Sequence, residues 1–292
     1  MVGTLFLPMR NERQNGRRVP RPFLKWAGGK GQLLEDLLAR VQAAKPFGRY
    51  HEPFLGGGAL FFEMVRRDEL DHRARLSDNN PNLIEAYMGL KEDVEDVISL
   101  LKKHKERHSE EYYYKVRAGV PEGMLERAAR VIYLNKTCYN GLYRENQSGE
   151  FNVPCGRYKN PSICDEENLR AVALALKNAR VEARRFATVL DAAKPGDLVY
   201  FDPPYHPLSK TSSFTGYEKT GFNEDSQRAL AEVYKKLVAM DVKVLLSNSM
   251  TPLVQELYRD FSIDEVYAKR SVNSRADRRG KICEALVRNF NL

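Results

Sequence analysis

The chain has 292 residues, of which 42% are hydrophobic and 29% are charged. This composition excludes a disordered protein and allows one large α/β core with a smaller inserted part. No apolar run approaches the roughly 18 residues of a membrane-spanning helix, so we expect no membrane partner. The formal net charge of +8 favours a polyanionic partner, and the cations are dense at 10–30, 102–107, 115–159 and 269–281.

Several features of the chain favour a protein that works in a reducing compartment and holds no metal. Residues 1–20 are basic and polar without the apolar segment of a secretory signal, so we expect a loose basic tail there. The four cysteines show no Cys-x-x-Cys spacing, which argues against disulfides and against a zinc site. His104 and His108 lie four residues apart among lysine and glutamate, and we interpret them as part of a solvated helix face.

The first segment with a chemical pattern is a glycine pair between Trp26 and Lys30, in the run Lys25-Trp26-Ala27-Gly28-Gly29-Lys30. A nucleoside triphosphate loop is excluded, because Leu24 stands where that pattern needs its first glycine and Gly31 where it needs serine or threonine. The glycines instead let the backbone turn closely past a ligand. Apolar residues at helical spacing then predict a helix over 31–44.

A second glycine turn follows a predicted strand near residue 50, in the run Glu52-Pro53-Phe54-Leu55-Gly56-Gly57-Gly58. A strand, a glycine turn and a helix form the first unit of a doubly wound sheet. Gly56 and Gly58 match the dinucleotide fingerprint, but Phe61 replaces its third glycine, which disfavours a nicotinamide cofactor. Asp78 ends the next strand where such folds place a carboxylate on ribose. S-adenosylmethionine fits this nucleoside pocket without a pyrophosphate clamp.

The strongest signal is Asp202-Pro203-Pro204-Tyr205, directly after the apolar run 198–201. The run predicts a buried central strand, which the two prolines end. A carboxylate, a carbonyl and an aromatic ring therefore meet at the carboxyl end of a strand, where open α/β sheets bind ligands. The Asp202 carboxylate and the Pro203 carbonyl can accept both N–H groups of a planar exocyclic amine and free its lone pair. The Tyr205 ring can stack on the base.

The remaining pattern alternates helices and strands. Helices are predicted over 92–114, 126–134 and 167–177. Two further helices are predicted to begin after the capping residue Asn223 and at Pro252. Strands are predicted over 181–183, 242–249 and 282–287. Turn formers, aromatic residues and cations alternate over 135–159, which predicts a hairpin with exposed side chains. We expect a mobile loop over 210–222 that closes on the substrate, and a basic loop over 267–279 that contacts phosphates.

These segments together resemble the DNA adenine methyltransferases of the Dam type. The residues that carry the resemblance are 25–30, 52–58, 77–80, 202–205 and much of 135–159. The order, with cofactor motifs first and Asp-Pro-Pro-Tyr last, resembles the α arrangement of amino-methyltransferases. The resemblance implies a Rossmann-like α/β fold with a doubly wound, mostly parallel sheet. It further implies a catalytic domain over 21–88 and 172–292, and an inserted, mainly helical target-recognition domain with a β-hairpin over 89–171.

The resemblance also implies a reaction and its residues. The enzyme would transfer a methyl group from S-adenosylmethionine to adenine N6 of GATC in double-stranded DNA, after flipping the base and without a metal. The catalytic residues would be Asp202, Pro203, Pro204 and Tyr205. The cofactor would contact Trp26, Gly28, Gly29, Lys30, Phe54, Gly56, Gly58, Asp78, Phe186 and Asp202. DNA would contact Lys25, Tyr139, Asn140, Leu142, Arg144, Asn146 and Arg157.

Within that set, Arg144 and Lys25 would each bind a guanine. Leu142 would contact the thymine methyl group, and Arg157 would bind a phosphate. Tyr139 and Asn140 would hold the gap left by the flipped base. Glu145 and Cys155 depart from the family pattern, which puts the fine contacts there in doubt.

Three alternatives stay open on the sequence. Pro154-Cys155 matches the nucleophile of cytosine-C5 methyltransferases, although an exocyclic amine needs no covalent intermediate. An Asp-Pro-Pro-Tyr enzyme can act on cytosine N4 or on a protein amide instead of adenine. A catalytically inactive DNA-binding regulator could use the same scaffold. We expect a cytoplasmic, nucleoid-associated monomer, and a cognate restriction endonuclease, if there is one, need not touch it.

Overall fold

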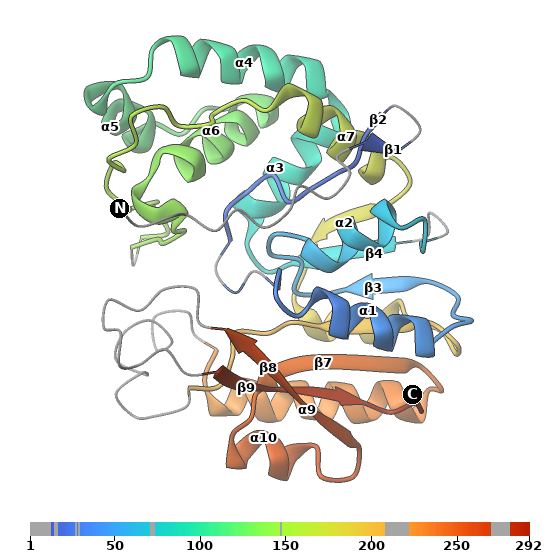
Figure 1. Cartoon of the computed structure of the whole chain (residues 1–292). Helices are drawn as coiled ribbons and strands as arrows, with labels where there is room; N and C mark the ends of the chain where they lie inside the picture. The colour runs from blue at the N-terminus through green and yellow to red at the C-terminus, as the bar shows by residue number, and fades with distance from the viewer. Residues whose placement is uncertain are drawn as a thin grey trace, which may run out of the picture. The chain divides into compact units, whose positions relative to one another are not determined.

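The computed structural model describes residues 13–14, 17–26, 28, 30–70, 74–146, 148–207, 222–269 and 281–292 (Figure 1). Gly29 and most of the predicted tail 1–20, loop 210–222 and basic loop 267–279 lie outside these residues. The chain forms two compact units. The helical unit comprises the described parts of Met1–Trp26, Phe62–Glu69 and Glu85–Lys177, and the sheet unit those of Ala27–Phe61, Leu70–Ile84 and Asn178–Leu292.

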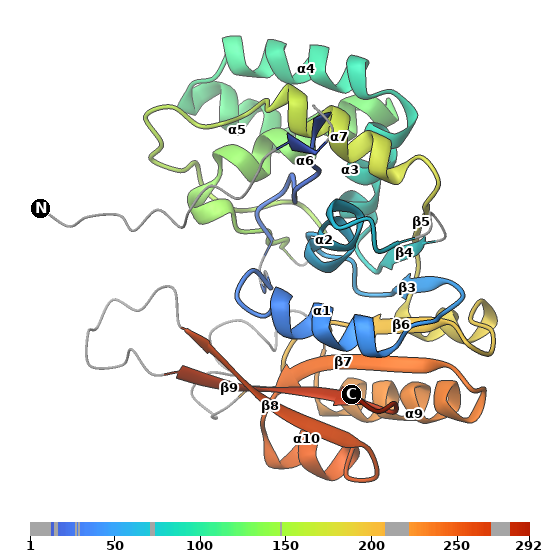
Figure 2. The same cartoon turned by 45° about the vertical axis from the view of Figure 1, so that its right-hand side comes forward.

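The sheet unit is built on seven strands in the order β5-β4-β3-β6-β7-β9-β8 (Figure 2). Their bounds are β3 Tyr50–Glu52, β4 Ala74–Asp78, β5 Arg180–Ala183, β6 Leu198–Phe201, β7 Lys243–Ser249, β8 Ser262–Lys269 and β9 Lys281–Arg288. The pairs among β3 to β7 are parallel, and β9 is antiparallel to both of its neighbours. The predicted mostly parallel α/β sheet is thereby confirmed. The predicted start of the basic loop 267–279 is wrong, because residues 267–269 continue β8.

The order of the strands reverses between β3 and β6. From β3 the chain runs outward through β4 and β5, and it then returns to β6 on the other side of β3. Tyr50 pairs with Leu198, and Leu198 pairs with Lys243 of β7. Because parallel strands end at one edge of a sheet, the turns after β3 and β6 open at the same edge. Ligands of doubly wound folds bind at such a reversal.

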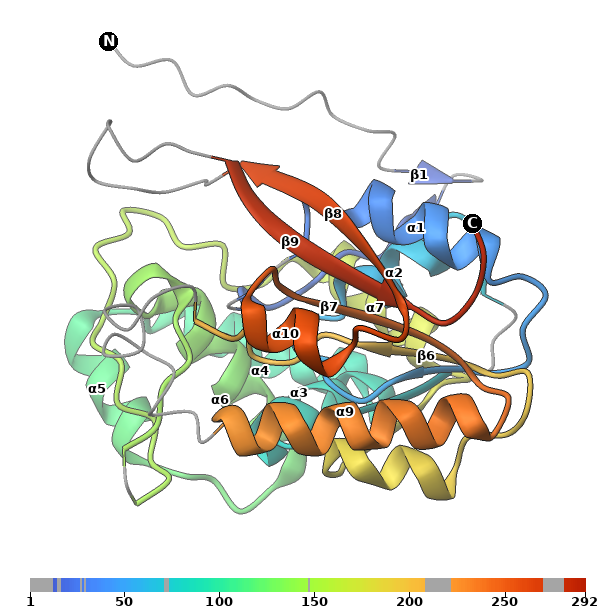
Figure 3. The same cartoon turned by 90° about the horizontal axis from the view of Figure 1, so that it is seen from below.

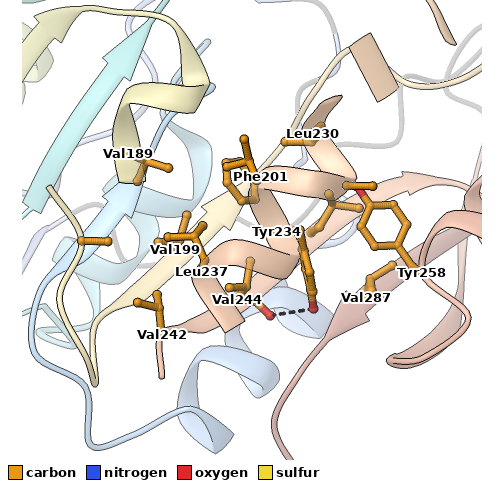
Figure 4. Packing of buried hydrophobic residues seen from close by; sticks show 14 of the residues in the cluster. Val189, Val199, Phe201, Leu230, Tyr234, Leu237, Val242, Val244, Tyr258 and Val287 are labelled. Carbon is orange, nitrogen blue, oxygen red and sulfur yellow. Dashed lines mark hydrogen bonds between the residues drawn. The ribbon is translucent and has the colours of Figure 1, made fainter. Parts of the chain in front are cut away.

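Helices cover both faces of the strands β6 and β7. Figure 3 shows α1 (Leu34–Ala43) and α9 (Glu224–Ala239) on opposite sides of these strands. On the α9 side, Val199 and Phe201 of β6 pack with Leu230 and Leu237, and full burial of each such side chain contributes about 1.5–3 kcal/mol (Figure 4). The cluster also contains residues of η2 (Phe186–Asp191), α10 (Pro252–Leu257) and β9. This packing fixes the strand that carries Asp202.

The predicted start of α9 is confirmed, because the Asn223 side chain accepts the N–H of Ser226 at 3.0 Å. α10 begins at Pro252, as predicted. Tyr234 of α9 donates its hydroxyl to the carbonyl of Val244 on β7 at 3.3 Å, so this buried polar group is satisfied within the core (Figure 4).

The helical unit contains α4 (Val94–Glu106), α5 (Glu110–Ala118), α6 (Met124–Thr137) and α7 (Glu166–Leu176), and the two-residue strands β1 (Arg13–Gln14) and β2 (Arg17–Arg18). α2 (Ala59–Arg66) and α3 (Pro81–Glu92) each begin in the sheet unit and end in the helical unit. The single helical run predicted over 92–114 is two helices. The reason is capping: Asp93 accepts the N–H of Asp96, and Ser109 accepts that of Tyr112 and starts a new helix.

The interpretation of His104 and His108 as a solvated face is wrong. The His104 ring stacks on Tyr133 with 4.7 Å between ring centres and hydrogen-bonds the Tyr112 hydroxyl at 2.9 Å, while His108 bonds the Tyr133 hydroxyl at 2.9 Å. Burial lowers the pKa of His104 to about 4. The pair is therefore part of an aromatic cluster between α4, α5 and α6, and His104 is uncharged at neutral pH.

Among the described residues, no helix is long and apolar enough to cross a membrane. The four cysteines carry free thiols. Within the same described ranges, His, Cys, Asp and Glu side chains form no group of three or more that could hold a metal ion.

Candidate active site

Asp202 follows β6 at the reversal of the sheet, and two side chains hold its carboxylate. Lys30 Nζ lies 2.8 Å from Oδ1, and the Ser247 hydroxyl at the end of β7 donates to the same oxygen at 2.9 Å. Burial raises the pKa of Asp202, and the ion pair with Lys30, which is only 8% exposed, partly offsets that rise. No described residue donates a hydrogen bond to Oδ2, so one carboxylate oxygen is open to another donor.

The loop after Asp202 is fixed on both sides of Tyr205. Gln227 of α9 donates to the Pro204 carbonyl at 3.0 Å, and the His206 N–H donates to Asn248 of β7 at 2.9 Å. Asn248 in turn donates to Gln227 at 3.0 Å, which joins the two anchors. The Pro203 carbonyl receives no hydrogen bond from any residue that the structure describes. The loop is thus rigid, and the acceptor predicted to bind an amine is available.

The Tyr205 ring has a contact at its face and another at its hydroxyl. Lys30 Nζ lies 4.3 Å from the ring centre, a cation–π distance. The hydroxyl donates to Glu284 Oε2 of β9 at 2.7 Å. Glu284 could not be singled out from the sequence, because the pattern of β9 does not reveal which residue of another segment it faces.

The glycine turn after β3 is held by the end of β4. The Asp78 carboxylate accepts the backbone N–H of Gly56 at 2.9 Å and that of Asn80 at 3.0 Å. Gly56 and Gly58 have φ of 47° and 66°, a backbone conformation that favours glycine. Burial raises the pKa of Asp78, against the effect of these N–H donors. The structure therefore brings together three residues predicted for the cofactor.

Aromatic rings gather beside this turn. Phe54 stacks on Phe186 with 5.3 Å between ring centres, so two residues predicted to contact the cofactor lie side by side. Phe222 completes the cluster, at 5.6 Å from Phe54 and 6.0 Å from Phe186. Its place in the cluster was missed, because the sequence pattern assigned Phe222 to a loop.

Glu52 at the end of β3 begins the run 52–58, but no role was assigned to it from the sequence. It is 2% exposed, and it accepts the Tyr50 hydroxyl at 2.8 Å. Burial raises its pKa to about 8, and the nearby Asp202 and Asp78 add to the rise. Glu52 is therefore mostly protonated at neutral pH, which limits the negative charge at this edge.

In the helical unit, Asn135 of α6 ties Lys25 to the turn that follows α6. Its side chain accepts the Lys25 N–H and donates to the Lys25 carbonyl, both at 2.8 Å, and it also donates to the Gly141 carbonyl at 3.3 Å. A Cβ at Gly141 would lie 2.3 Å from the Lys25 side chain, so only glycine fits there. Lys25 and the turn Tyr139–Gly141 form one rigid piece.

Residues 144–152 have the predicted hairpin geometry. The Asn152 N–H donates to the Arg144 carbonyl at 3.0 Å, and the Asn146 N–H donates to that of Glu150 at 2.9 Å. The pairing amounts to an isolated bridge between Glu145 and Phe151 and not to two regular strands. Arg144 Nε donates to the Asn152 side chain at 2.6 Å. Nearby, Tyr139 and Leu142 are 51% and 46% exposed, so their side chains are accessible to a ligand.

The comparison with protein families decides the identity. The family model described as D12 class N6 adenine-specific DNA methyltransferase matches residues 26–272. The chain belongs to this class. The match covers both the glycine turns and the Asp-Pro-Pro-Tyr segment, whereas Lys25 and Glu284 lie outside it.

Curated relatives agree with this membership. The D12-class chain is 41% identical over 278 residues to Type II methyltransferase M1.LlaDCHI of Lactococcus lactis subsp. cremoris, covering 92% of this chain and 95% of the relative. It is 43% identical over 287 residues to Type II methyltransferase M.MjaIII of Methanocaldococcus jannaschii, with 92% and 99% covered. It is 36% identical over 271 residues to the DNA adenine methylase of Escherichia coli (strain K12), with 91% and 94% covered.

Membership in the D12 class resolves most of the alternatives left by the sequence. The reaction of the class is N6 methylation of adenine in DNA, and not methylation of cytosine or of a protein amide. Cys155 agrees with this outcome, since burial raises the pKa of its thiol and a covalent mechanism would need a thiolate.

Two other predicted residues lie in the helical unit. The Trp26 ring packs on Tyr143 of the hairpin with 5.0 Å between ring centres, and Arg157 is exposed. The cofactor role of Trp26 and the phosphate role of Arg157 stay predictions.

Proposed function

We propose that this D12-class enzyme transfers the methyl group of S-adenosylmethionine to adenine N6 within GATC, after flipping the adenine out of double-stranded DNA. The observation that carries the proposal is the pair of open acceptors after β6. Asp202 Oδ2 and the Pro203 carbonyl lie on a loop whose backbone is held by Gln227 and Asn248, next to the ring of Tyr205.

The chemistry follows from these acceptors. The N6 lone pair of adenine is delocalised into the ring and is a weak nucleophile. Two hydrogen bonds, to Asp202 and to the Pro203 carbonyl, localise that lone pair on N6, and Tyr205 holds the base by stacking. S-adenosylmethionine supplies a methyl group on a positively charged sulfur. As the N–C bond forms, the bond between the methyl carbon and sulfur breaks, its electron pair stays on sulfur and S-adenosylhomocysteine leaves. The amine loses one proton to the hydrogen-bonded carboxylate or to water. Positioning and electrostatics supply the rate enhancement.

The sheet unit offers suitable groups for the cofactor. The turn from Gly56 to Gly58 allows close approach of a ligand, and Asp78 offers acceptor oxygens for ribose hydroxyls. The stacked Phe54 and Phe186 offer an apolar surface for the adenine of the cofactor. Gly28, Gly29, Lys30 and Trp26 complete the proposed set.

DNA recognition is assigned to the hairpin and to Lys25. Arg144 would donate two hydrogen bonds to a guanine edge, the commonest specific contact in the major groove. Leu142 would contact the thymine methyl group, and Tyr139 with Asn140 would hold the gap left by the flipped adenine. Lys25 would contact a second guanine. Arg157 would bind a phosphate and contribute to the salt dependence of binding, and Asn146 would also contact DNA.

The test is methylation of a random-sequence duplex library with S-adenosylmethionine, followed by sequencing of modified bases and mass analysis of the nucleosides. We expect N6-methyladenine confined to GATC. Methylation at another adenine sequence would overturn the GATC assignment, and modified cytosine would overturn the acceptor. Specific DNA binding with no methylation would favour an inactive regulator. The same preparation, measured by light scattering, tests the expected monomer.

A further inference from the structure

Glu284 of β9 lies outside the motif segments that carry the sequence resemblance and outside residues 26–272 of the family match, yet its Oε2 accepts the Tyr205 hydroxyl at 2.7 Å. We propose that Glu284 is a positioning residue for methyl transfer, which fixes the Tyr205 ring in the plane on which the target base stacks. This inference rests on the proposed function of Tyr205. It assigns to a residue of the last strand a role in the reaction at the Asp-Pro-Pro-Tyr loop.

The backbone of the loop does not by itself fix the ring. Gln227 and Asn248 hold the peptide groups on either side of Tyr205, and the prolines restrict the chain before it. The side chain still has two torsions, and a change of rotamer would move the ring by several ångströms. A hydrogen bond at the hydroxyl, the atom farthest from the backbone, removes that freedom.

Glu284 is a suitable anchor because its own position is fixed. It is paired with Ser249 of β7 on one side and with Val266 of β8 on the other, so its backbone belongs to the sheet. The distance of 2.7 Å is typical of a strong O–H···O hydrogen bond. The ring is therefore held between a rigid loop and a rigid strand.

The effect of the hydrogen bond that Glu284 accepts and the effect of its negative charge can be tested separately. Lys30 Nζ contacts Asp202 and the face of the Tyr205 ring, and its charge also interacts with Glu284. Glu284→Gln removes the negative charge and keeps an oxygen that can accept the Tyr205 hydroxyl. Glu284→Leu removes both. A positioning role predicts that glutamine is tolerated and leucine is not.

The experiment is a double-mutant cycle on the full-length enzyme. Glu284→Leu, Tyr205→Phe and the double variant are compared with wild type by single-turnover methylation of a duplex with one target site. We expect each single variant to be about tenfold slower, with unchanged KM for S-adenosylmethionine and for DNA, and the double variant to be no slower than either. Glu284→Gln should remain within about twofold of wild type.

The outcomes separate this inference from the proposed function. Additive losses in the cycle, or a Tyr205→Phe enzyme as fast as wild type, would overturn the positioning role. A Gln variant as slow as the Leu variant would show that charge, and not position, matters. Thermal unfolding shows whether each variant is folded. If Glu284→Leu fails to fold, Tyr205→Phe and Glu284→Gln still test the positioning role. A wild-type enzyme that methylates no adenine would instead overturn the proposed function.

Discussion

The edge of the sheet unit and the hairpin of the helical unit hold their polar groups in different ways. At the sheet edge, the groups proposed for catalysis are bonded to residues far away in the sequence: Asp202 to Lys30, and Tyr205 to Glu284. In the hairpin, Arg144 is exposed and bonded to Asn152 of the same hairpin. Chemistry requires groups that are fixed before the substrate arrives, whereas sequence readout requires side chains that can exchange one partner for a base.

The largest expected effect is the loss of catalysis in Asp202→Ala, because one of the two acceptors for the amine disappears. Methyl transfer should fall by at least about a thousandfold, while DNA affinity stays within about twofold of wild type. Transfer of a radiolabelled methyl group and fluorescence anisotropy measure the two quantities. Asp260→Ala, which removes an exposed carboxylate of the same unit, is the control. A catalytically active Asp202→Ala would refute the proposed role.

The next effect concerns the link between Lys25 and the turn Tyr139–Gly141. Asn135→Ala removes three hydrogen bonds and leaves buried backbone groups unpaired, so the free energy of unfolding should fall by about 2–3 kcal/mol. Discrimination at the base pair read by Lys25 should weaken as well. Denaturant unfolding and competition with singly substituted sites measure both, and the exposed Asn178→Ala is the control. Unchanged discrimination would show that Lys25 does not depend on this clamp.

Arg144→Ala and Arg157→Ala form a matched pair. Loss of Arg144 should cost about 1–3 kcal/mol at one guanine and relax the choice of base there. Loss of Arg157 should weaken binding equally on all sequences. It should also reduce the slope of log affinity against log salt concentration by about one, the contribution of one phosphate contact. Binding to GATC and to its single-base variants at several salt concentrations distinguishes them. An equal loss on every sequence with Arg144→Ala would remove its reading role.

Glu52 offers a test by pH. Its pKa rises from the usual 4.5 to about 8 in the folded protein, so the folded state binds an extra proton in that interval. The free energy of unfolding should therefore decrease as the pH rises from 5 to 8, by up to about 1.4 kcal/mol per pH unit. Glu52→Gln should flatten this slope, whereas the exposed Glu232→Gln should not. Parallel pH profiles for wild type and Glu52→Gln would contradict a buried, protonated Glu52.

The smallest expected effect is that of Cys155→Ser. The thiol lies in the helical unit and burial raises its pKa, so methyl transfer should stay within about twofold of wild type. The same radiolabel assay measures it. A folded but inactive Cys155→Ser enzyme would point to a covalent mechanism and would weaken the contrast between the two regions.

The features that the sequence predicted depend on local patterns. The apolar run before Asp202, the prolines after it and the cap at Asn223 each determine structure within a few residues. The strand β8 was missed, because charged residues such as Asp264 and Glu265 interrupt its apolar pattern. The aromatic cluster around His104 and the bond from Tyr205 to Glu284 were missed for a different reason. Both depend on contacts between distant segments, which no spacing within one segment encodes.

The pairing of β3 with β6 determines the order in which parts of the chain can fold during synthesis. Tyr50 pairs with Leu198, and Tyr205 bonds to a residue of β9, so the catalytic edge joins segments from across the chain. Contacts of this kind form slowly, because the long intervening loop must close first. On the ribosome the helices and hairpin of 94–176 emerge before β6 exists. A nascent chain is therefore expected to fold the part proposed to read DNA before it is able to methylate.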